Sequence, residues 1–379
     1  MKKHRALKIT GIVLGAIILL LAAFVGIVCL RLSGAVKNLE RVDDRGILYS
    51  MDYTASYDNA LMKLPITYIK TAGCSAFVTR NEEGDVITAR NYDLAHTDDD
   101  GNATGLNVIF TLEPEGKYKS INLADAAWLT IIGLPYTAGA FDEGGASPMF
   151  LAFMPYLCMD GMNEKGLTVS ILALDVKDGE EPVNQTQEGK ETVTITELLR
   201  LMLDNCADVD EAVALAQEYN LTNIIGSDFH LFVTDADGRS VVMEWRWNTL
   251  YLTWQDAVTN FYVGFADAED CYYGDTLKER FVAAEGLTRA YSYGYGHGYE
   301  RFNILARTLD EHIVDLATYA TVMTEEEAMD TLAAASQVYD GTDISSNTQY
   351  SVIYNSADLT AEVCVMRDYE EHYYFSLAE

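Results

Sequence analysis

A cysteine, an arginine and an aspartate within one short segment are the residues of this sequence best suited to chemistry. Cys74 stands at the start of one run with strand character, and Arg90 and Asp93 stand at the end of the next. The residues between the two runs, Asn81–Gly84, favour a turn, so the pattern predicts a hairpin that returns the arginine and the aspartate to the cysteine. A nearby cation lowers the pKa of a thiol and favours the reactive thiolate. This spacing is compatible with a cysteine nucleophile. By itself it more often reflects a buried structural cysteine beside a surface ion pair.

The remaining cysteines and the histidines show no spacing that suits a metal site. The sequence has neither paired Cys-x-x-Cys motifs nor a His-Glu-x-x-His motif, so we expect no metal and no cofactor. Cys29 falls in an apolar run near the N-terminus. The other cysteines lie in apolar or helical contexts and are predicted to be packed thiols: Cys158, Cys206, Cys271 and Cys364.

Charge and composition exclude several classes of protein. The 379 residues include 58 acidic and 26 basic ones, which gives a formal net charge of −32. Hydrophobic residues at 49% and charged residues at 22% indicate a globular core and exclude a disordered, collagen-like or coiled-coil chain. We expect no nucleic acid partner, because phosphate binding needs clustered lysine and arginine.

The N-terminal part of the chain has the pattern of a membrane segment. Ile9–Leu30 contains no charge and is long enough to cross about 30 Å of hydrocarbon as a helix. Basic residues precede it, so the positive-inside rule keeps residues 1–8 in the cytoplasm and exports the chain after residue 30. We expect residues 9–30 to be a transmembrane anchor, with a cleaved signal as the alternative. Residues 31–73 are predicted to be a tether or propeptide, with a helix around Ser33–Val42, and residues 74–379 to be one globular domain.

The globular part contains strands and helices in alternating blocks. Strands are predicted at Ser75–Thr79, Asp85–Asn91, Asn107–Leu112, Gly166–Leu174, in a hairpin over Phe229–Trp247, as a pair within Leu250–Val263, and at Tyr350–Tyr354 and Glu362–Arg367. Helices are predicted as a pair within Thr192–Tyr219, the second capped by Asp208, and at Thr276–Ala290, Glu300–Leu309 and Thr324–Ala335. This order indicates an α+β fold with packed antiparallel sheets.

Several motifs occur in an order that resembles a known family. They are the Cys-x15-Arg-x2-Asp segment that starts at Cys74, the sequence DGMNEKGL at Asp160–Leu167, the hairpin Phe229–Glu244, the triplet Val258–Asn260 and the segment Tyr299–Phe302. Together they resemble the choloylglycine hydrolase family of linear amide C–N hydrolases, which includes bile salt hydrolases and penicillin V acylases. The resemblance runs from Gly73 to about residue 367. It implies an N-terminal-nucleophile hydrolase with a four-layer α-β-β-α sandwich as the catalytic domain.

The resemblance also implies roles for the residues of the hairpin. Cys74 would be the nucleophile, and its own α-amino group would be the general base once the bond after Gly73 is cut. An α-amine with a pKa of about 7.7–8.0 suits proton transfer at neutral pH. Asp93 would hold that amine, and Arg90 would lie near the sulfur.

Two later residues complete the site that the resemblance implies. Asn260 would offer its side-chain amide to the oxyanion, and Arg301 would complete the polar cluster. The sequence departs from the bile acid hydrolases just after DGMNEKGL, where it has Ala173 in place of an asparagine. A backbone N–H at Ala173 is expected to replace that donor, and conjugated bile acids become doubtful substrates.

These features predict an extracytoplasmic, membrane-anchored amidase that works through an acyl-enzyme on Cys74. The expected partner is a small N-acyl amide, with N-acyl amino acids or phenoxyacetyl-type amides preferred to taurine conjugates. Transfer of the acyl group to an amine is one alternative, and a catalytically inactive surface binding module is another. The resemblance is also compatible with a homo-oligomer.

Overall fold

The structure, a computed structural model, describes ten stretches of the chain. They are residues 34–57, 73–94, 96, 104–174, 182–223, 228–263, 281–283, 290–292, 297–338 and 347–378. The predicted membrane segment Ile9–Leu30, Cys29 and Cys271 lie outside them. No helix within these stretches combines the length and the apolar character needed to span a membrane.

The larger of two main sheets in the described part of the chain has nine strands. In spatial order they are β1 (Val36–Arg41), β2 (Leu48–Tyr53), β5 (Asn107–Leu112), β6 (Ser120–Asp125), β7 (Cys158–Asn163), β8 (Thr168–Leu174), β11 (Asp228–Thr234), β12 (Ser240–Arg246) and β13 (Thr249–Thr253). Neighbouring strands are antiparallel except β2 and β5, which are parallel.

The second sheet has six strands and carries the predicted hairpin. Its order is β14 (Ala257–Val258), β3 (Gly73–Arg80), β4 (Val86–Asp93), β19 (Thr348–Asn355), β20 (Thr360–Val365) and β21 (Tyr373–Ser376). All its pairs are antiparallel. Every residue of β4 is buried, because this strand lies between β3 and β19 and is covered on both faces.

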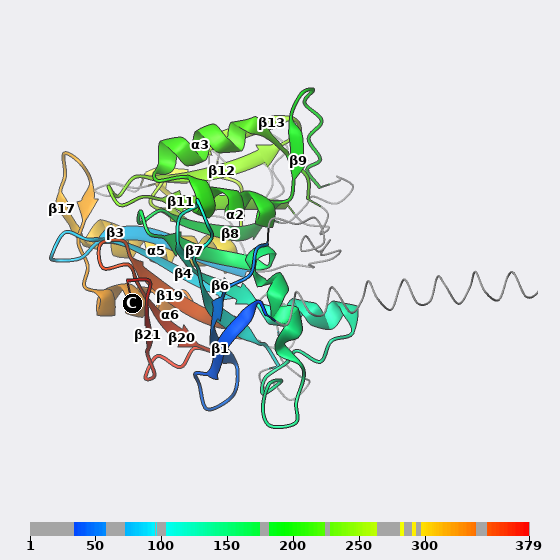
Figure 1. The fold of residues 1–379 in the computed structure, drawn as a ribbon. Helices are drawn as coiled ribbons and strands as arrows, with labels where there is room; N and C mark the ends of the chain where they lie inside the picture. Colours follow the sequence, from blue (N-terminus) through cyan, green and yellow to red (C-terminus); the bar gives the residue numbers. More distant parts are fainter. Residues whose placement is uncertain are drawn as a thin grey trace, which may run out of the picture.

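Helices cover the outer faces of the two sheets. The larger sheet carries α2 (Ile195–Asn205) and α3 (Val209–Glu218), and the smaller sheet carries α5 (His297–Glu311) and α6 (Glu325–Ala334). Contacts place α2 and α3 on β7, β8 and β11 and place α5 and α6 on β3, β4 and β19, and Figure 1 shows α3 next to β11 and β12 at the upper part of the molecule. The α+β fold with antiparallel sheets that the sequence predicts is confirmed.

Three of the described α-helices, α2, α3 and α6, begin where the sequence offers a side-chain cap. Thr194 and Thr324 form capping boxes with the glutamates three residues later, and Asp208 caps α3 as predicted. These caps satisfy backbone N–H groups that a first helical turn leaves without partners.

The remaining described elements are short. They are the 3₁₀ helices η1 (Ala126–Ile132) and η2 (Pro148–Tyr156), and the strand pairs β9 (Glu191–Val193) with β10 (Tyr219–Leu221), β15 (Phe281–Ala283) with β16 (Ala290–Ser292), and β17 (Ile313–Asp315) with β18 (Ala320–Thr321).

Three element predictions are wrong. The helix expected around Ser33–Val42 is replaced by β1, in which Asn38 has a φ of 48° that no right-handed helix accepts. The two strands within Leu250–Val263 do not pair with each other, since β13 and β14 belong to different sheets. The helix expected over Thr276–Ala290 is contradicted at β15, and most of that range lies outside the described residues.

Candidate active site

Cys74 lies in β3, where its backbone is held on both sides by polar side chains. Its N–H donates to Asn260 Oδ1 at 2.6 Å, and its carbonyl oxygen accepts from the Arg301 guanidinium. The cysteine is 1% exposed, so the intact chain offers no open approach to the sulfur. Asn260 and Arg301, which lie far downstream in the sequence, thus hold the backbone of the predicted nucleophile.

Arg90 connects the two sheets directly beside the thiol. It comes from β4, opposite Ala76 of β3, and its Nη2 lies 3.5 Å from Cys74 Sγ. The guanidinium also donates to the carbonyl oxygens of Met159 and Ile171 in the facing sheet. Its position is therefore set by both sheets together.

A buried carboxylate balances the charge of Arg90. Asp160 forms an ion pair with Arg90, and both side chains are 0% exposed. The hydroxyls of Tyr350 and Tyr354, two residues of β19, each donate to Asp160 at 2.6 Å. Burial and the nearby Asp160 carboxylate raise the pKa of both tyrosines well above its usual range, so the hydroxyls stay protonated and keep donating.

Asp93 is fixed by residues that follow α6. Thr348 donates its hydroxyl to one carboxylate oxygen at 2.6 Å, and Gln337 donates its amide to the other at 2.8 Å. Arg301 lies 3.4 Å from the same carboxylate. Asp93 also faces Gly73 across the hairpin, so it stands opposite the residue that precedes the cysteine.

Asn260 and Arg301 hold each other in place. Arg301 Nη2 donates to Asn260 Oδ1 at 2.7 Å, and Asn260 Nδ2 donates to the Ala173 carbonyl oxygen at 2.7 Å. Thr259 donates to the Gly298 carbonyl oxygen at 2.7 Å, which fastens the start of α5 beside β14. The Ala173 carbonyl oxygen therefore contacts Asn260, while the oxyanion role expected for the Ala173 N–H stays a prediction.

Opposing effects act on the Cys74 thiol. Burial raises its pKa, while Arg90 works in the other direction through its charge and its hydrogen bond. Burial prevails, so the pKa lies above its usual value and the thiol of the intact chain stays protonated. Burial works to lower the pKa of Arg90, but Asp160 and Tyr350 act more strongly in the opposite direction. The pKa therefore lies above its usual value, and the guanidinium stays charged.

The structure therefore brings all five predicted site residues together: Cys74, Arg90, Asp93, Asn260 and Arg301. Sequence reasoning missed the residues that position them, which are Asp160, Gln337, Thr348, Tyr350 and Tyr354. Asp160 opens the DGMNEKGL motif, and that place in the motif could have indicated it. The other four have no local pattern that singles them out.

The other cysteines and Asn163 have structural roles. Cys158, Cys206 and Cys364 are buried free thiols, as predicted, and burial raises the pKa of each to about 12. Asn163 donates to the carbonyl oxygens of Leu203 and Cys206, so it ties the turn after β7 to the end of α2. No group of three or more His, Cys, Asp or Glu side chains in the described stretches is arranged to hold a metal ion.

Comparisons with known proteins agree with this geometry. Residues 74–260 match the family model described as linear amide C–N hydrolases, choloylglycine hydrolase family, which confirms the resemblance. A mutant of conjugated bile acid hydrolase from Clostridium perfringens superposes with a TM-score of 0.52 and 16% identity, covering 80% of this chain and 92% of that one. Penicillin V acylase from Agrobacterium tumefaciens gives 0.50 and 16%, covering 81% and 87%. Both likenesses are in fold. No curated protein matches the sequence.

Proposed function

Because residues 74–260 belong to the choloylglycine hydrolase family of linear amide C–N hydrolases, we propose that Cys74 is the nucleophile with which this protein cleaves an amide. One observation carries the assignment. Asn260 and Arg301 hold the backbone N–H and the carbonyl oxygen of Cys74, while the Arg90 guanidinium lies 3.5 Å from its sulfur. A merely structural cysteine does not need three buried polar side chains directed at its atoms.

The proposed enzyme first requires a cut between Gly73 and Cys74. The thiol attacks the Gly73 carbonyl carbon, the acyl group moves from nitrogen to sulfur, and water opens the thioester. The products are a carboxylate on Gly73 and a free α-amino group on Cys74. Asn260 Oδ1, which accepts from this nitrogen in the intact chain, would remain its partner. An outside protease acting at the same bond is the alternative.

The freed amine then acts as the general base in hydrolysis. It takes the proton of the thiol, the sulfur attacks the amide carbon of the substrate, and the oxyanion forms. We assign Asn260 Nδ2, fixed by Ala173 and Arg301, as a donor to that oxyanion. One such donor contributes about 2.7–4 kcal/mol in other enzymes. The amine product leaves with the proton, and water hydrolyses the thioester to release the acid.

The substrate class follows the family and remains the prediction made from the sequence. We propose N-acyl amino acids or phenoxyacetyl-type amides in preference to taurine conjugates, because Ala173 contributes no side-chain amide. Acyl transfer to an amine is the second candidate, since water and amines compete for the same thioester. The place of this domain outside the cytoplasm is proposed on the N-terminal charge pattern alone.

An assay of released amine over a panel of amides tests the proposal. Wild type should release amine and form an acyl adduct on the fragment that begins at Cys74, as seen by intact mass. Cys74→Ala should do neither, while Cys206→Ala, a change at a buried thiol remote from the cluster, should behave as wild type. A Cys74→Ala protein with the full wild-type rate would refute the assignment. Faster turnover of taurocholate than of every simple acyl amide would overturn the substrate class.

A further inference from the structure

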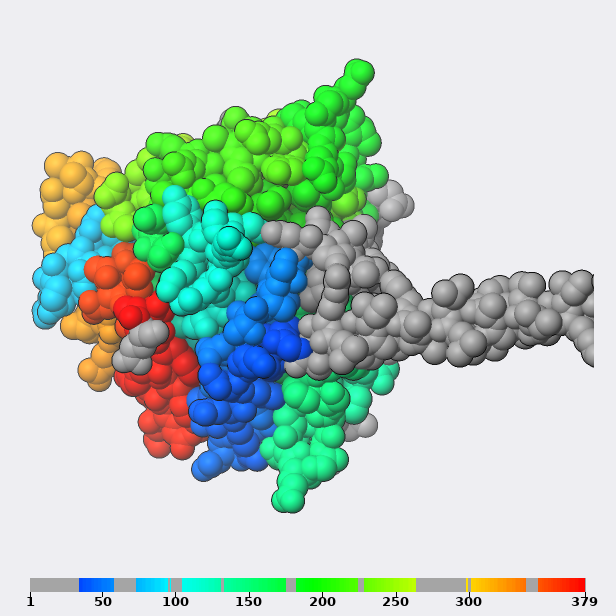
Figure 2. Space-filling model, viewed as in Figure 1, coloured from blue at the N-terminus to red at the C-terminus, as the bar shows by residue number. Residues whose placement is uncertain are grey.

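Residues 34–57 precede the proposed nucleophile in the chain, yet they are built into the larger sheet. β2 lies between β1 and β5, so of the two strands in this segment only β1 is at an edge of the sheet. β2 pairs in parallel with β5 over its whole length, from Leu48 opposite Asn107 to Tyr53 opposite Leu112. The Asn107 N–H also donates to the Ile47 carbonyl oxygen at 2.7 Å, which extends the pairing beyond the strand. Figure 2 shows this segment in blue, between the red C-terminal strands and blue-green residues from the middle of the chain.

The apolar side chains of the segment belong to the core. Leu48, Met51, Tyr53 and Tyr57 are each less than 5% exposed. Tyr53 donates its hydroxyl to the Ala152 carbonyl oxygen of η2 at 3.0 Å. Removal of the segment would uncover these contacts and leave the backbone of β5 as an open strand edge, which favours aggregation.

Tyr57 closes a buried cluster of charges on α2. Its hydroxyl donates to Asp204 Oδ1 at 2.8 Å, and the ammonium of Lys117 lies 4.9 Å from the centre of its ring. Arg200 and Lys117 both contact the same aspartate. The carboxylate at the end of α2 is therefore completed by a residue that lies before Cys74 in the chain.

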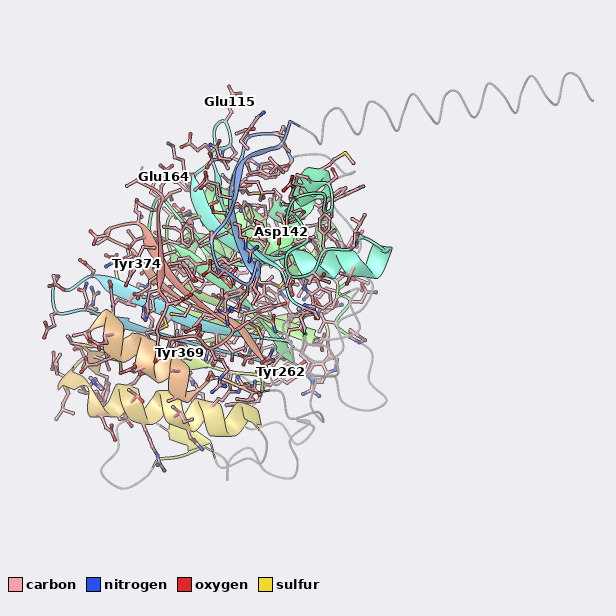
Figure 3. All side chains as sticks on the ribbon, turned by 90° about the horizontal axis from the view of Figure 1, so that it is seen from below. Glu115, Asp142, Glu164, Tyr262, Tyr369 and Tyr374 are labelled. Carbon is pink, nitrogen blue, oxygen red and sulfur yellow. The ribbon has the colours of Figure 1, made fainter. Side chains whose placement is uncertain are left out.

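Polar contacts fasten the β1–β2 hairpin to two further places. Asp142 lies beside the blue ribbon in Figure 3, where it accepts from Arg41 at 3.0 Å and from the Tyr49 hydroxyl at 3.1 Å. Arg45 donates to the Val365 carbonyl oxygen of β20 at 3.0 Å, so the hairpin also touches the second sheet. The turn is also tied together internally, since the buried Asp43 accepts from two successive backbone N–H groups.

From these contacts we propose that residues 34–57 stay bound without a covalent link after the cut before Cys74. The mature protein is then a two-chain particle whose small chain completes the nine-stranded sheet. Any membrane segment in residues 9–30 would stay attached to the catalytic part through this small chain, so the cut would activate the enzyme without releasing it. The inference rests on the proposed function only for the position of the cut.

A direct test tracks the two chains of the processed protein. Size-exclusion chromatography and native mass spectrometry at micromolar concentration should show one particle that contains both chains. The two masses should separate only in denaturant. A processed wild type whose small chain elutes alone, while the remainder keeps its melting temperature and its amidase rate, would overturn the proposal.

A second arm makes the test independent of the proposed chemistry. A recognition sequence for a site-specific protease is inserted after Ala60 in a Cys74→Ala chain, which is then cut in vitro. The small chain should again co-elute with the large one, whether or not the wild type cleaves itself or hydrolyses any amide. Separation of the two chains in this arm would sink the inference and leave the proposed function untouched.

A mild variant tests the contact with Asp204. Tyr57→Phe in the protease-cut protein removes a single hydroxyl and should speed dissociation of the small chain in urea about tenfold, because hydrogen bonds to charged groups are among the stronger ones. Tyr319→Phe, at a half-exposed tyrosine on another part of the surface, is the matched control and should leave the rate unchanged. Equal rates for the two variants would contradict the role given to Tyr57.

Discussion

Replacing Asp160 with asparagine should destabilise the folded chain, because it removes the carboxylate that Arg90 contacts in the interior. Both side chains are fully buried, and the Arg90 guanidinium is charged. Breaking a buried ion pair by removing one partner costs about 3–5 kcal/mol, since the remaining charge loses its compensation. The substitution Asp160→Asn keeps the size of the side chain, so no cavity adds to this figure.

Two further variants divide that cost. Tyr354→Phe removes one hydrogen bond to the Asp160 carboxylate and leaves the ion pair, so the expected loss is about 1.5–3 kcal/mol. In the double variant Arg90→Met with Asp160→Asn, the uncompensated cation is gone. It should therefore be more stable than Asp160→Asn alone, by about 1 kcal/mol or more.

Urea unfolding followed by circular dichroism provides the measurement. All variants are made in the Cys74→Ala chain, so that every protein has the same covalent state. Asp160→Asn should unfold at the lowest urea concentration of the series. Equal midpoints for Asp160→Asn and its parent would show that Arg90 is not held by this pair. A double variant no more stable than Asp160→Asn alone would refute the reasoning about the unpaired charge.

Three other predictions concern maturation, catalysis and pH. Intact-mass analysis should find wild type cut between Gly73 and Cys74, with Cys74→Ala uncut if cleavage is autocatalytic; a fully active uncut wild type would exclude the N-terminal-nucleophile mechanism. Asn260→Ala should lower kcat about 100- to 1,000-fold in the amine-release assay, and an unchanged kcat would remove its oxyanion role. Burial works to lower the pKa of His96, but the Asp125 carboxylate 2.7 Å away raises it above its ordinary value. The stabilisation by the His96–Asp125 pair is therefore complete below about pH 6.5 and is lost as the pH rises through the raised pKa of the folded state. The urea midpoint of wild type should exceed that of His96→Gln by more at about pH 5.5 than at about pH 9. A difference that does not change with pH would contradict this.

Local patterns predicted the elements whose causes are themselves local. The β3–β4 hairpin follows from the turn at Asn81–Gly84, where the Asn81 side chain accepts from the Asp85 N–H at 2.8 Å. The start of α3 follows from its cap, Asp208. The order of motifs also indicated the five predicted site residues, because each motif occupies a short segment of the chain.

The residues that support the site had no such pattern. Asp160 comes from β7, Tyr350 from β19 and Gln337 from the segment after α6, and each meets its partner only across a layer or a sheet. A single aspartate, tyrosine or glutamine carries no local sign of the distant group it will contact. The packing of the two sheets decides those contacts.

The sequence by itself indicated the fold class, the hairpin that joins Cys74 to Arg90, and the family whose model residues 74–260 match. Only the tertiary structure showed that residues 34–57 form part of the larger sheet. A parallel pair such as β2–β5 needs a long connection between its strands, so no turn signal marks it in the sequence. The tertiary structure also decided the state of the thiol. A cation at hairpin distance predicts a lowered pKa, but only the burial created by the packed sheets shows that desolvation outweighs Arg90 and raises the pKa of Cys74.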